Sequence, residues 1–101
     1  MANLVFPLPN NEYLVAGSAS VTLSSGAGSL TVSEVSTIDA ILYLDAQNSS
    51  SSAYTLVKAT GNPSSNSVPV EVLDGTVGGT AANPTLSSAS SATVYFAVIG
   101  H

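Results

Sequence analysis

The clearest strand pattern of the chain lies in residues 37–45, which have the sequence TIDAILYLD. Alternate positions of an extended strand point to opposite faces. We expect one face of this segment to point into a core, and that face consists of Ile38, Ala40, Leu42 and Leu44. The other face is mixed and consists of Asp39, Ile41, Tyr43 and Asp45. A helix is the main alternative, but the β-branched and aromatic residues and the flanking turn residues favour a strand.

Further strand patterns lie on both sides of this segment at short spacing. Alternation of apolar and polar residues between Gly, Ser, Asn and Pro clusters predicts strands at residues 20–24, 30–35, 54–60 and 68–73. The polar run 47–52, QNSSSS, predicts a mobile loop. A stretch from 76 to 91 is rich in Gly, Ala, Ser and Thr, and predicts a long loop with one weak strand near residues 85–87.

Two segments also indicate where a strand lies in its sheet. Pro69 cannot donate a ladder hydrogen bond, so we expect residues 68–73 to form an edge strand. Residues 93–99, TVYFAVI, are apolar on both faces, which predicts a central strand or one covered by another chain. With about six or seven short strands and no convincing helix, the sequence predicts an all-β fold, an antiparallel β-sandwich of the immunoglobulin-like or jelly-roll-like kind.

The N-terminal segment differs from the rest of the chain. Residues 1–16, MANLVFPLPNNEYLVA, are apolar at the start, but Pro7 and Pro9 exclude a helix or a central strand. We expect an extended N-terminal arm over residues 1–16 and a β-sandwich domain over residues 17–101. The segment is either an edge strand on its own domain or an arm that reaches a neighbouring subunit, where its apolar side chains would be buried.

The charge of the chain excludes several classes of partner. The net charge is −5 and Lys58 is the only lysine or arginine, so the chain cannot neutralise a series of phosphates. We therefore expect no binding to nucleic acid, and none to an anionic membrane surface. No cysteine is present, and we see neither a signal peptide nor an apolar run of membrane-spanning length, which favours synthesis in the cytosol. Charged residues make up only 7% of the chain, so few charges need desolvation on contact with another protein.

The sequence offers little for catalysis. His101 is the only histidine and stands at the end of the sequence, where we expect it to be mobile rather than held as a general base. Four carboxylates could in principle meet in space, but no calcium-loop spacing connects Asp39, Asp45, Glu71 and Asp74. We expect no enzyme activity, no catalytic residues, no cofactor and no metal site. Tyr43 is the best candidate for an exposed ring that could stack on a sugar.

The chain resembles small β-sandwich virion proteins of tailed bacteriophages, above all head decoration (cement) proteins. The resemblance lies in an apolar, proline-containing start, MANLVFPLP, in a series of short strands rich in Ser, Thr, Gly and Ala, and in an aromatic last strand, ATVYFAVIG. The segment VSTIDAILYL is also similar to phage structural proteins. The resemblance implies a structural protein, made in the host cytoplasm, that binds the major capsid protein on the outer surface of the head and stabilises it.

The resemblance also implies a homotrimer and an interface. The N-terminal segment would be the anchor, and the last strand would supply part of the subunit contact. The interface residues on this hypothesis are Leu4, Val5, Phe6, Leu8, Tyr95 and Ile99. The alternatives are a phage tail or fibre module, a bacterial adhesin-like module, and a glycan-binding β-sandwich.

Overall fold

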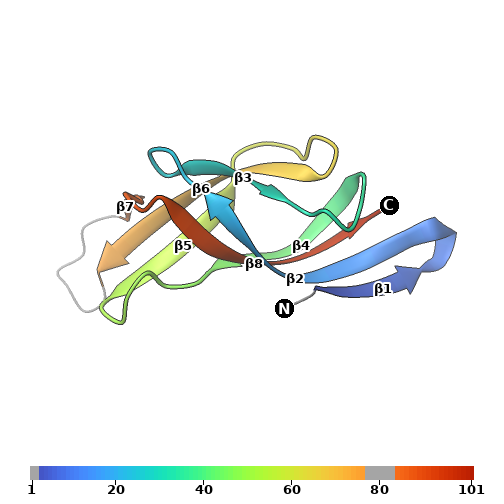
Figure 1. The fold of residues 1–101 in the computed structure, drawn as a ribbon, viewed down its shortest axis with the longest axis horizontal. Coiled ribbons are helices and arrows are strands. Elements are labelled where there is room, and N and C mark those ends of the chain that lie inside the picture. The colour runs from blue at the N-terminus through green and yellow to red at the C-terminus, as the bar shows by residue number, and fades with distance from the viewer. Residues whose placement is uncertain (1–2, 77–83) are drawn as a thin grey trace.

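The structure is a computed structural model of the chain, and it describes residues 3–76 and 84–101. These residues form two antiparallel β-sheets that lie face to face (Figure 1). Sheet A has the strand order β1-β2-β8-β4, and sheet B has the order β3-β6-β5, with a short β7 also paired to β6. The strands are β1 (Leu4–Leu8), β2 (Glu12–Thr22), β3 (Ala27–Thr31), β4 (Ile38–Ala46), β5 (Ala53–Ala59), β6 (Ser67–Thr76), β7 (Thr85–Leu86) and β8 (Ser91–Gly100).

The predicted all-β sandwich is confirmed. The weak strand predicted near residues 85–87 is present as β7, which pairs with Leu73 and Asp74 of β6. Residues 77–83, which belong to the predicted long loop 76–91, lie outside the described residues.

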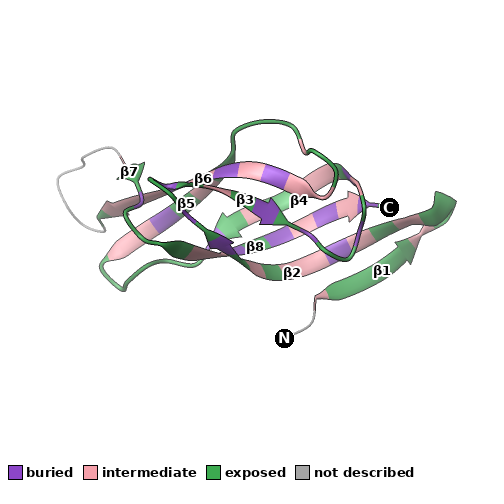
Figure 2. Cartoon of the chain, turned by 45° about the horizontal axis from the view of Figure 1, so that its top comes forward, coloured by how far each residue is buried: buried purple, intermediate pink, exposed green. Residues whose placement is uncertain are grey.

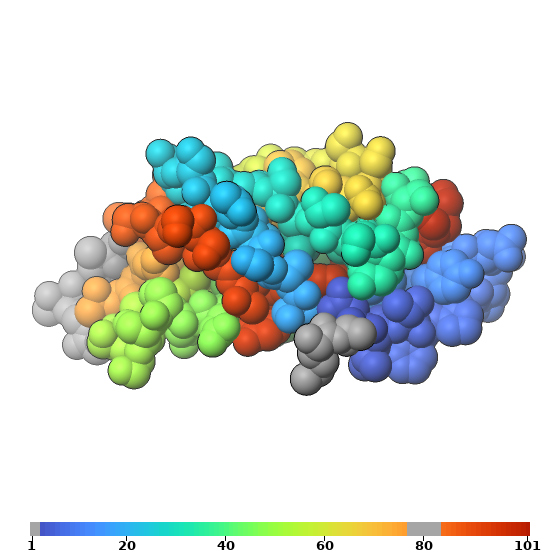
Figure 3. Space-filling model, viewed as in Figure 1, coloured from blue at the N-terminus to red at the C-terminus, as the bar shows by residue number. Residues whose placement is uncertain are grey.

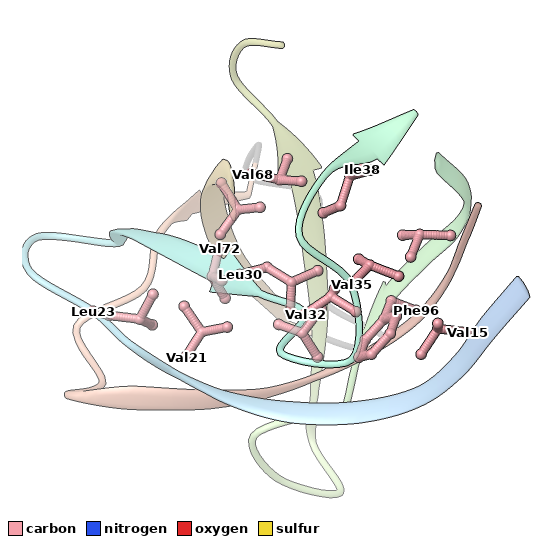
Figure 4. Close-up of a cluster of buried hydrophobic side chains, with 13 residues drawn as sticks. Val15, Val21, Leu23, Leu30, Val32, Val35, Ile38, Val68, Val72 and Phe96 are labelled. Atoms are coloured by element: carbon pink, nitrogen blue, oxygen red, sulfur yellow. The ribbon is translucent and has the colours of Figure 1, made fainter. Parts of the chain in front are cut away.

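The core lies between the two sheets and consists mainly of valines. Alternation along each strand sends every second side chain inward, as the banded colouring of β6 and β8 shows (Figure 2). Sheet A contributes Val15, Val94, Phe96 and Val98, and sheet B contributes Leu30, Val68, Val70 and Val72, all buried. Their side chains meet in one cluster (Figure 4). Full burial of an aliphatic or aromatic side chain contributes roughly 1.5–3 kcal/mol relative to exposure, so this cluster is the main source of stability.

β8 and β6 are both central strands of their sheets, but the sequence predicted this position only for β8. β8 lies between β2 and β4, which confirms the prediction of a central last strand. The prediction of an edge strand at residues 68–73 is wrong, because β6 lies between β3 and β5. Pro69 lies just beyond the last pair of the β5–β6 ladder, although its carbonyl still accepts a hydrogen bond from Thr60 N–H at 2.9 Å. The N–H that proline lacks would point to the same side of the strand, where regular pairing has already ended. The proline is therefore tolerated in a central strand.

β4 departs from the predicted alternation. Its pairing with β8 shifts register between Ile38 and Ala40 and again between Ile41 and Tyr43. Each shift inserts one residue and reverses which side chains face inward. Ile41 and Leu44 therefore pack against the core, whereas Leu42 is 59% exposed. The predicted inward face of Ile38, Ala40, Leu42 and Leu44 is thus wrong at Leu42 and also at Ala40, which pairs with Ile99 on the opposite face. The assignment of Ile41 to the outer face is wrong as well.

The predicted extended arm is not confirmed. Residues 4–8 form the edge strand of sheet A and pair with β2 through a turn at Pro9–Asn11, the alternative in which the segment lies on its own domain. Asn10 and Asn11 occupy left-handed backbone conformations in this turn (φ 66° and 61°), which asparagine adopts more readily than most residues. The boundary predicted between residues 16 and 17 falls inside β2.

The β1–β2 hairpin nevertheless extends well beyond the rest of the sandwich. It forms one end of an elongated molecule with extents of 49 × 22 × 20 Å (Figures 1 and 3). The base of the hairpin is tied to the domain by Asn3, whose side chain accepts a hydrogen bond from Ser18 N–H at 3.1 Å and donates one to Glu34 at 2.9 Å. None of the residues of β1 is buried. Sheet B therefore covers only part of sheet A.

Candidate interaction surface

The face of sheet A that points away from sheet B carries a continuous set of apolar side chains. Paired residues of neighbouring strands lie on the same face, so the register defines rows across the sheet. One row contains Leu4, Ala16, Ala97 and Tyr43, and the next contains Phe6, Leu14, Ile99 and Ala40. We call this surface the outer face of sheet A, and it consists of these two rows together with Leu8, Glu12, Ser18, Asp39, Asp45, Tyr95 and His101.

Large apolar side chains on this face remain open to water. The exposed fractions are 60% for Leu4, 51% for Phe6 and 53% for Tyr43. Single exposed apolar residues are normal on a protein surface, but a contiguous group of them is typical of a site that contacts another molecule. The outer face of sheet A is therefore the candidate functional site of the described residues.

The structure brings most of the predicted interface residues together. Leu4, Phe6 and Leu8 of β1 lie on the same face as Tyr95 and Ile99 of β8. Val5 does not join them, because it pairs with the buried Val15 and so lies on the opposite face. The projecting hairpin is therefore apolar on both sides, with Val5 on the one and Phe6 on the other.

One end of the outer face is polar and holds three ligand-type side chains. Tyr13 pairs with Gly100, which places Glu12 next to His101, while Asp39 lies at the first register shift of β4. The His101 Nδ1 atom is 2.8 Å from Asp39 Oδ2. Single ligand atoms of Glu12, Asp39 and His101 all lie within 4.8 Å of one another. We call these three residues the Glu12–Asp39–His101 cluster.

The backbone holds His101 in place. Its carbonyl accepts hydrogen bonds from Ser36 N–H at 2.8 Å and Thr37 N–H at 2.9 Å, and its N–H donates to the Thr37 carbonyl at 3.0 Å. The expectation of a mobile terminal imidazole is therefore wrong. The sequence contained no signal for this arrangement, because Glu12 and His101 come from opposite ends of the chain and only the β2–β8 register brings them together.

The three groups of the cluster shift one another's proton affinities. The hydrogen bond with His101 lowers the pKa of Asp39, and a hydrogen bond with Glu12 lowers it further. The hydrogen bond with Asp39 raises the pKa of His101 above its ordinary value of 6.5. A hydrogen bond with Asp39 also raises the pKa of Glu12, because two neighbouring carboxyl groups share a proton more easily than they both ionise. The hydrogen bond between Asp39 and His101 therefore favours a protonated imidazole beside an ionised carboxylate.

The other predicted carboxylates are separated from this cluster. Asp45 accepts a hydrogen bond from the Tyr43 hydroxyl at 3.0 Å, which raises the pKa of that hydroxyl. Glu71 forms an ion pair with Lys58 at 3.4 Å on sheet B. Asp74 accepts a hydrogen bond from the Thr55 hydroxyl at 2.6 Å. The four carboxylates singled out in the sequence thus do not meet.

Thr55 and Asp74 line a small polar hollow at the opposite end of the sandwich. Its volume is about 180 Å³, and its wall includes part of the loop between β4 and β5. Within the loop, Asn48 accepts a hydrogen bond from Thr55 N–H at 3.0 Å, and Ser49 N–H donates to the Thr55 hydroxyl at 3.0 Å. The predicted polar loop is present, and these bonds tie its first half to β5.

Comparison of the chain with protein-family models, with curated proteins and with solved structures found no match. Among the described residues, no helix has the length and apolarity that a membrane crossing requires. The description of the outer face of sheet A, with the Glu12–Asp39–His101 cluster at one end, therefore rests on its own residues and not on a relative. This face is a partly exposed apolar surface with a polar, acidic end.

Proposed function

We propose that the protein is a structural component of a tailed-phage virion, a head decoration protein that attaches to the major capsid protein on the outside of the head. The observation that carries this proposal is the uncovered apolar outer face of sheet A, on which Leu4, Phe6 and Tyr95 lie together. The resemblance of the whole chain to small virion proteins supplies the identity of the partner.

The composition of the face suits contact with a protein surface. Burial of apolar area contributes roughly 25 cal/mol per Å², whereas each charge that is buried must first lose its water. Apart from Asp45, the charged groups of the outer face lie in the cluster at one end, so most of the face can be covered without desolvating a charge. The neutral hydroxyl and amide groups elsewhere on the chain keep the uncovered protein hydrated.

The projecting hairpin provides the anchor on this proposal. Leu4 and Phe6 stand on one side of it and Val5 on the other, and sheet B covers neither side of its tip. A hairpin with two apolar faces can insert between two neighbouring surfaces. In a homotrimer, three such hairpins would bind at once, and linked contacts of modest strength produce a high combined affinity.

The first experiment measures the mass of the purified protein by size-exclusion chromatography with light scattering, over a range of concentrations. We expect a trimer in the wild type and a shift toward monomer in the double variant Leu4→Ser/Phe6→Ser. Val5→Ser is the matched control, because it removes a similar side chain from the opposite face of the same strand. If Val5→Ser dissociates the protein as well, the contact is the hairpin as a whole rather than the outer face of sheet A.

The second experiment tests the capsid partner. Purified protein is mixed with expanded, undecorated heads assembled from the major capsid protein encoded in the same genome, and the mixture is sedimented. We expect the wild type to sediment with the heads and to raise their resistance to heat, and Leu4→Ser/Phe6→Ser to remain in the supernatant. Binding to purified tails but not to heads would contradict the head assignment and favour the tail or fibre alternative.

One observation favours glycan binding as a second candidate. Tyr43 and Tyr95 are both exposed on the outer face, and Asp45 pairs with Tyr95 and accepts a hydrogen bond from Tyr43. Exposed rings beside a carboxylate can stack on a sugar and accept hydrogen bonds from its hydroxyls. A glycan array with the wild type and Tyr43→Ala tests this candidate, which requires a specific signal that the variant loses.

A further inference from the structure

We propose that the Glu12–Asp39–His101 cluster is a binding site for a first-row divalent metal ion such as Zn²⁺. The inference stands on the geometry of this cluster and does not depend on the proposed virion function. It concerns side chains from the ends of three neighbouring strands of sheet A.

The ligand set determines the kind of ion. An imidazole nitrogen and two carboxylate oxygens suit zinc and its neighbours, whereas calcium and magnesium prefer an all-oxygen shell. The three protein groups leave further coordination positions for water or for a group from a partner. The site would therefore be an open one rather than a closed structural centre.

The distances are close to those that a metal requires. Two ligands about 2.0–2.2 Å from one ion lie at most about 4.4 Å apart. The three ligand atoms already lie within 4.8 Å of one another, and His101 Nδ1 is 2.8 Å from Asp39 Oδ2. The side chains of His101 and Asp39 are 56% and 37% exposed, so small rotations can bring all three atoms around an ion.

The electrostatics of the cluster favour a cation. Lys58 is the only lysine or arginine of the chain and is paired with Glu71 on sheet B. Among the residues that the structure describes, only the imidazole therefore offsets the two carboxylates. A divalent ion would supply the positive charge that two neighbouring carboxylates lack.

The backbone prepares the site before any ion binds. His101 is held by three backbone hydrogen bonds to Ser36 and Thr37, and Glu12 is the first residue of β2 directly after the hairpin turn. An ion at this point would join the ends of β2, β8 and β4, which are adjacent in sheet A. We therefore expect metal binding to stiffen the turn end of the projecting hairpin and to raise the thermal stability of the protein.

The test is calorimetric titration of Zn²⁺ into the full chain, without an affinity tag, near pH 7. We expect one ion per chain, and a loss of affinity of at least about tenfold in each of Asp39→Asn, His101→Gln and Glu12→Gln, since even indirect partners of a metal cost about 10–100-fold. Asp45→Asn is the matched control, because it removes a carboxylate from the same face outside the cluster. We expect this control to bind as the wild type does, and an excess of Ca²⁺ not to compete.

Two further readouts locate the ion. In the wild type, the ring signals of the single histidine should shift on addition of Zn²⁺ and return on addition of a chelator. The melting temperature should rise with the logarithm of the Zn²⁺ concentration in the wild type and in Asp45→Asn, but not in His101→Gln. Absence of one-site binding, or equal affinity in the wild type and His101→Gln, would overturn the proposal. Circular dichroism checks that each variant keeps the strand content of the wild type.

Discussion

The two faces of sheet A are made by the same strands but have different neighbours. On the inner face, Val94, Phe96 and Val98 of β8 are buried against sheet B. On the outer face of the same strand, Tyr95 is 40% exposed, and Ala97 and Ile99 are half-buried. Both faces are largely apolar, so composition does not distinguish them.

The difference arises from coverage: the face that sheet B covers stabilises the fold, and the other face stays available for binding. A second sheet can close over only one side of sheet A, and sheet B ends before the β1–β2 hairpin. The closed side supplies the free energy of folding, because its side chains leave water when the chain folds. The open side can supply free energy only when another molecule covers it. Variants on the two faces should therefore affect different measurements.

The largest expected effect is that of Phe96→Ala on the inner face. Removal of a buried phenylalanine leaves a cavity and typically costs about 3–5 kcal/mol, a large part of the stability of a small domain. Tyr95→Ala, the neighbouring residue on the outer face, should cost much less. Chemical denaturation with circular dichroism measures both. Equal losses of unfolding free energy in the two variants would contradict the distinction between the faces.

The bulges of β4 allow the same comparison between two consecutive residues, one facing inward and one facing outward. Ile41 packs against the core and Leu42 is exposed, although the regular alternation predicts the reverse. Ile41→Ala should cost about 2 kcal/mol, the low end for such a truncation because Ile41 is only partly buried. Leu42→Ala should change the unfolding free energy by no more than about 0.5 kcal/mol. A larger cost for Leu42→Ala, measured by denaturation, would mean that β4 follows the regular alternation after all.

A smaller effect is expected where polar groups close one end of the sandwich. Thr55 is buried, and its hydroxyl donates to Asp74 and accepts from Ser49 N–H. Thr55→Val keeps the shape but leaves these partners without their hydrogen bonds, which should cost about 1–2 kcal/mol. Thr31→Val is the control, because the Thr31 hydroxyl pairs with Ser67 on the exposed surface. The two variants are compared by their denaturant midpoints. An equal loss of stability would show that the burial of this hydrogen-bond network adds nothing to the free energy of unfolding.

The smallest effect concerns the titration of His101 without metal. Asp39 raises the pKa of His101 in the folded chain, so protonation favours the folded state. This contribution to stability is complete below the unfolded pKa of about 6.5 and is lost as the pH rises through the folded value. A proton NMR titration in the presence of a chelator follows the single imidazole directly. We expect a pKa above 6.5 in the wild type and a lower one in Asp39→Asn. The same pKa in both would contradict the Asp39–His101 contact.

Much of the fold followed from local patterns in the sequence. Alternating valines at residues 68, 70 and 72, and apolar residues on both sides of 93–99, predicted the sandwich and the central position of β8. The position of β6 was mispredicted because a proline excludes a central strand only if its missing N–H faces an active ladder. At Pro69, the β5 ladder has already ended. The positions of Ala40 and Leu42 were mispredicted because a bulge leaves no residue-level signal, and residues 40–44, AILYL, carry no charge that would mark one face.

The candidate site, like the fold, was predicted only in part from the sequence. The sequence alone determined that the chain is rich in neutral polar residues, nearly free of cations and apolar at both ends, since these properties belong to the residues themselves. It also offered Leu4, Val5, Phe6, Leu8, Tyr95 and Ile99 as candidates for an interface. Only the tertiary structure decided that these residues except Val5 share one face, that Val5 lies on the other, and that Glu12, Asp39 and His101 meet. The physical reason is register: which residues become neighbours across a sheet depends on the pairing of strands distant in the chain, and local patterns contain no information about that pairing.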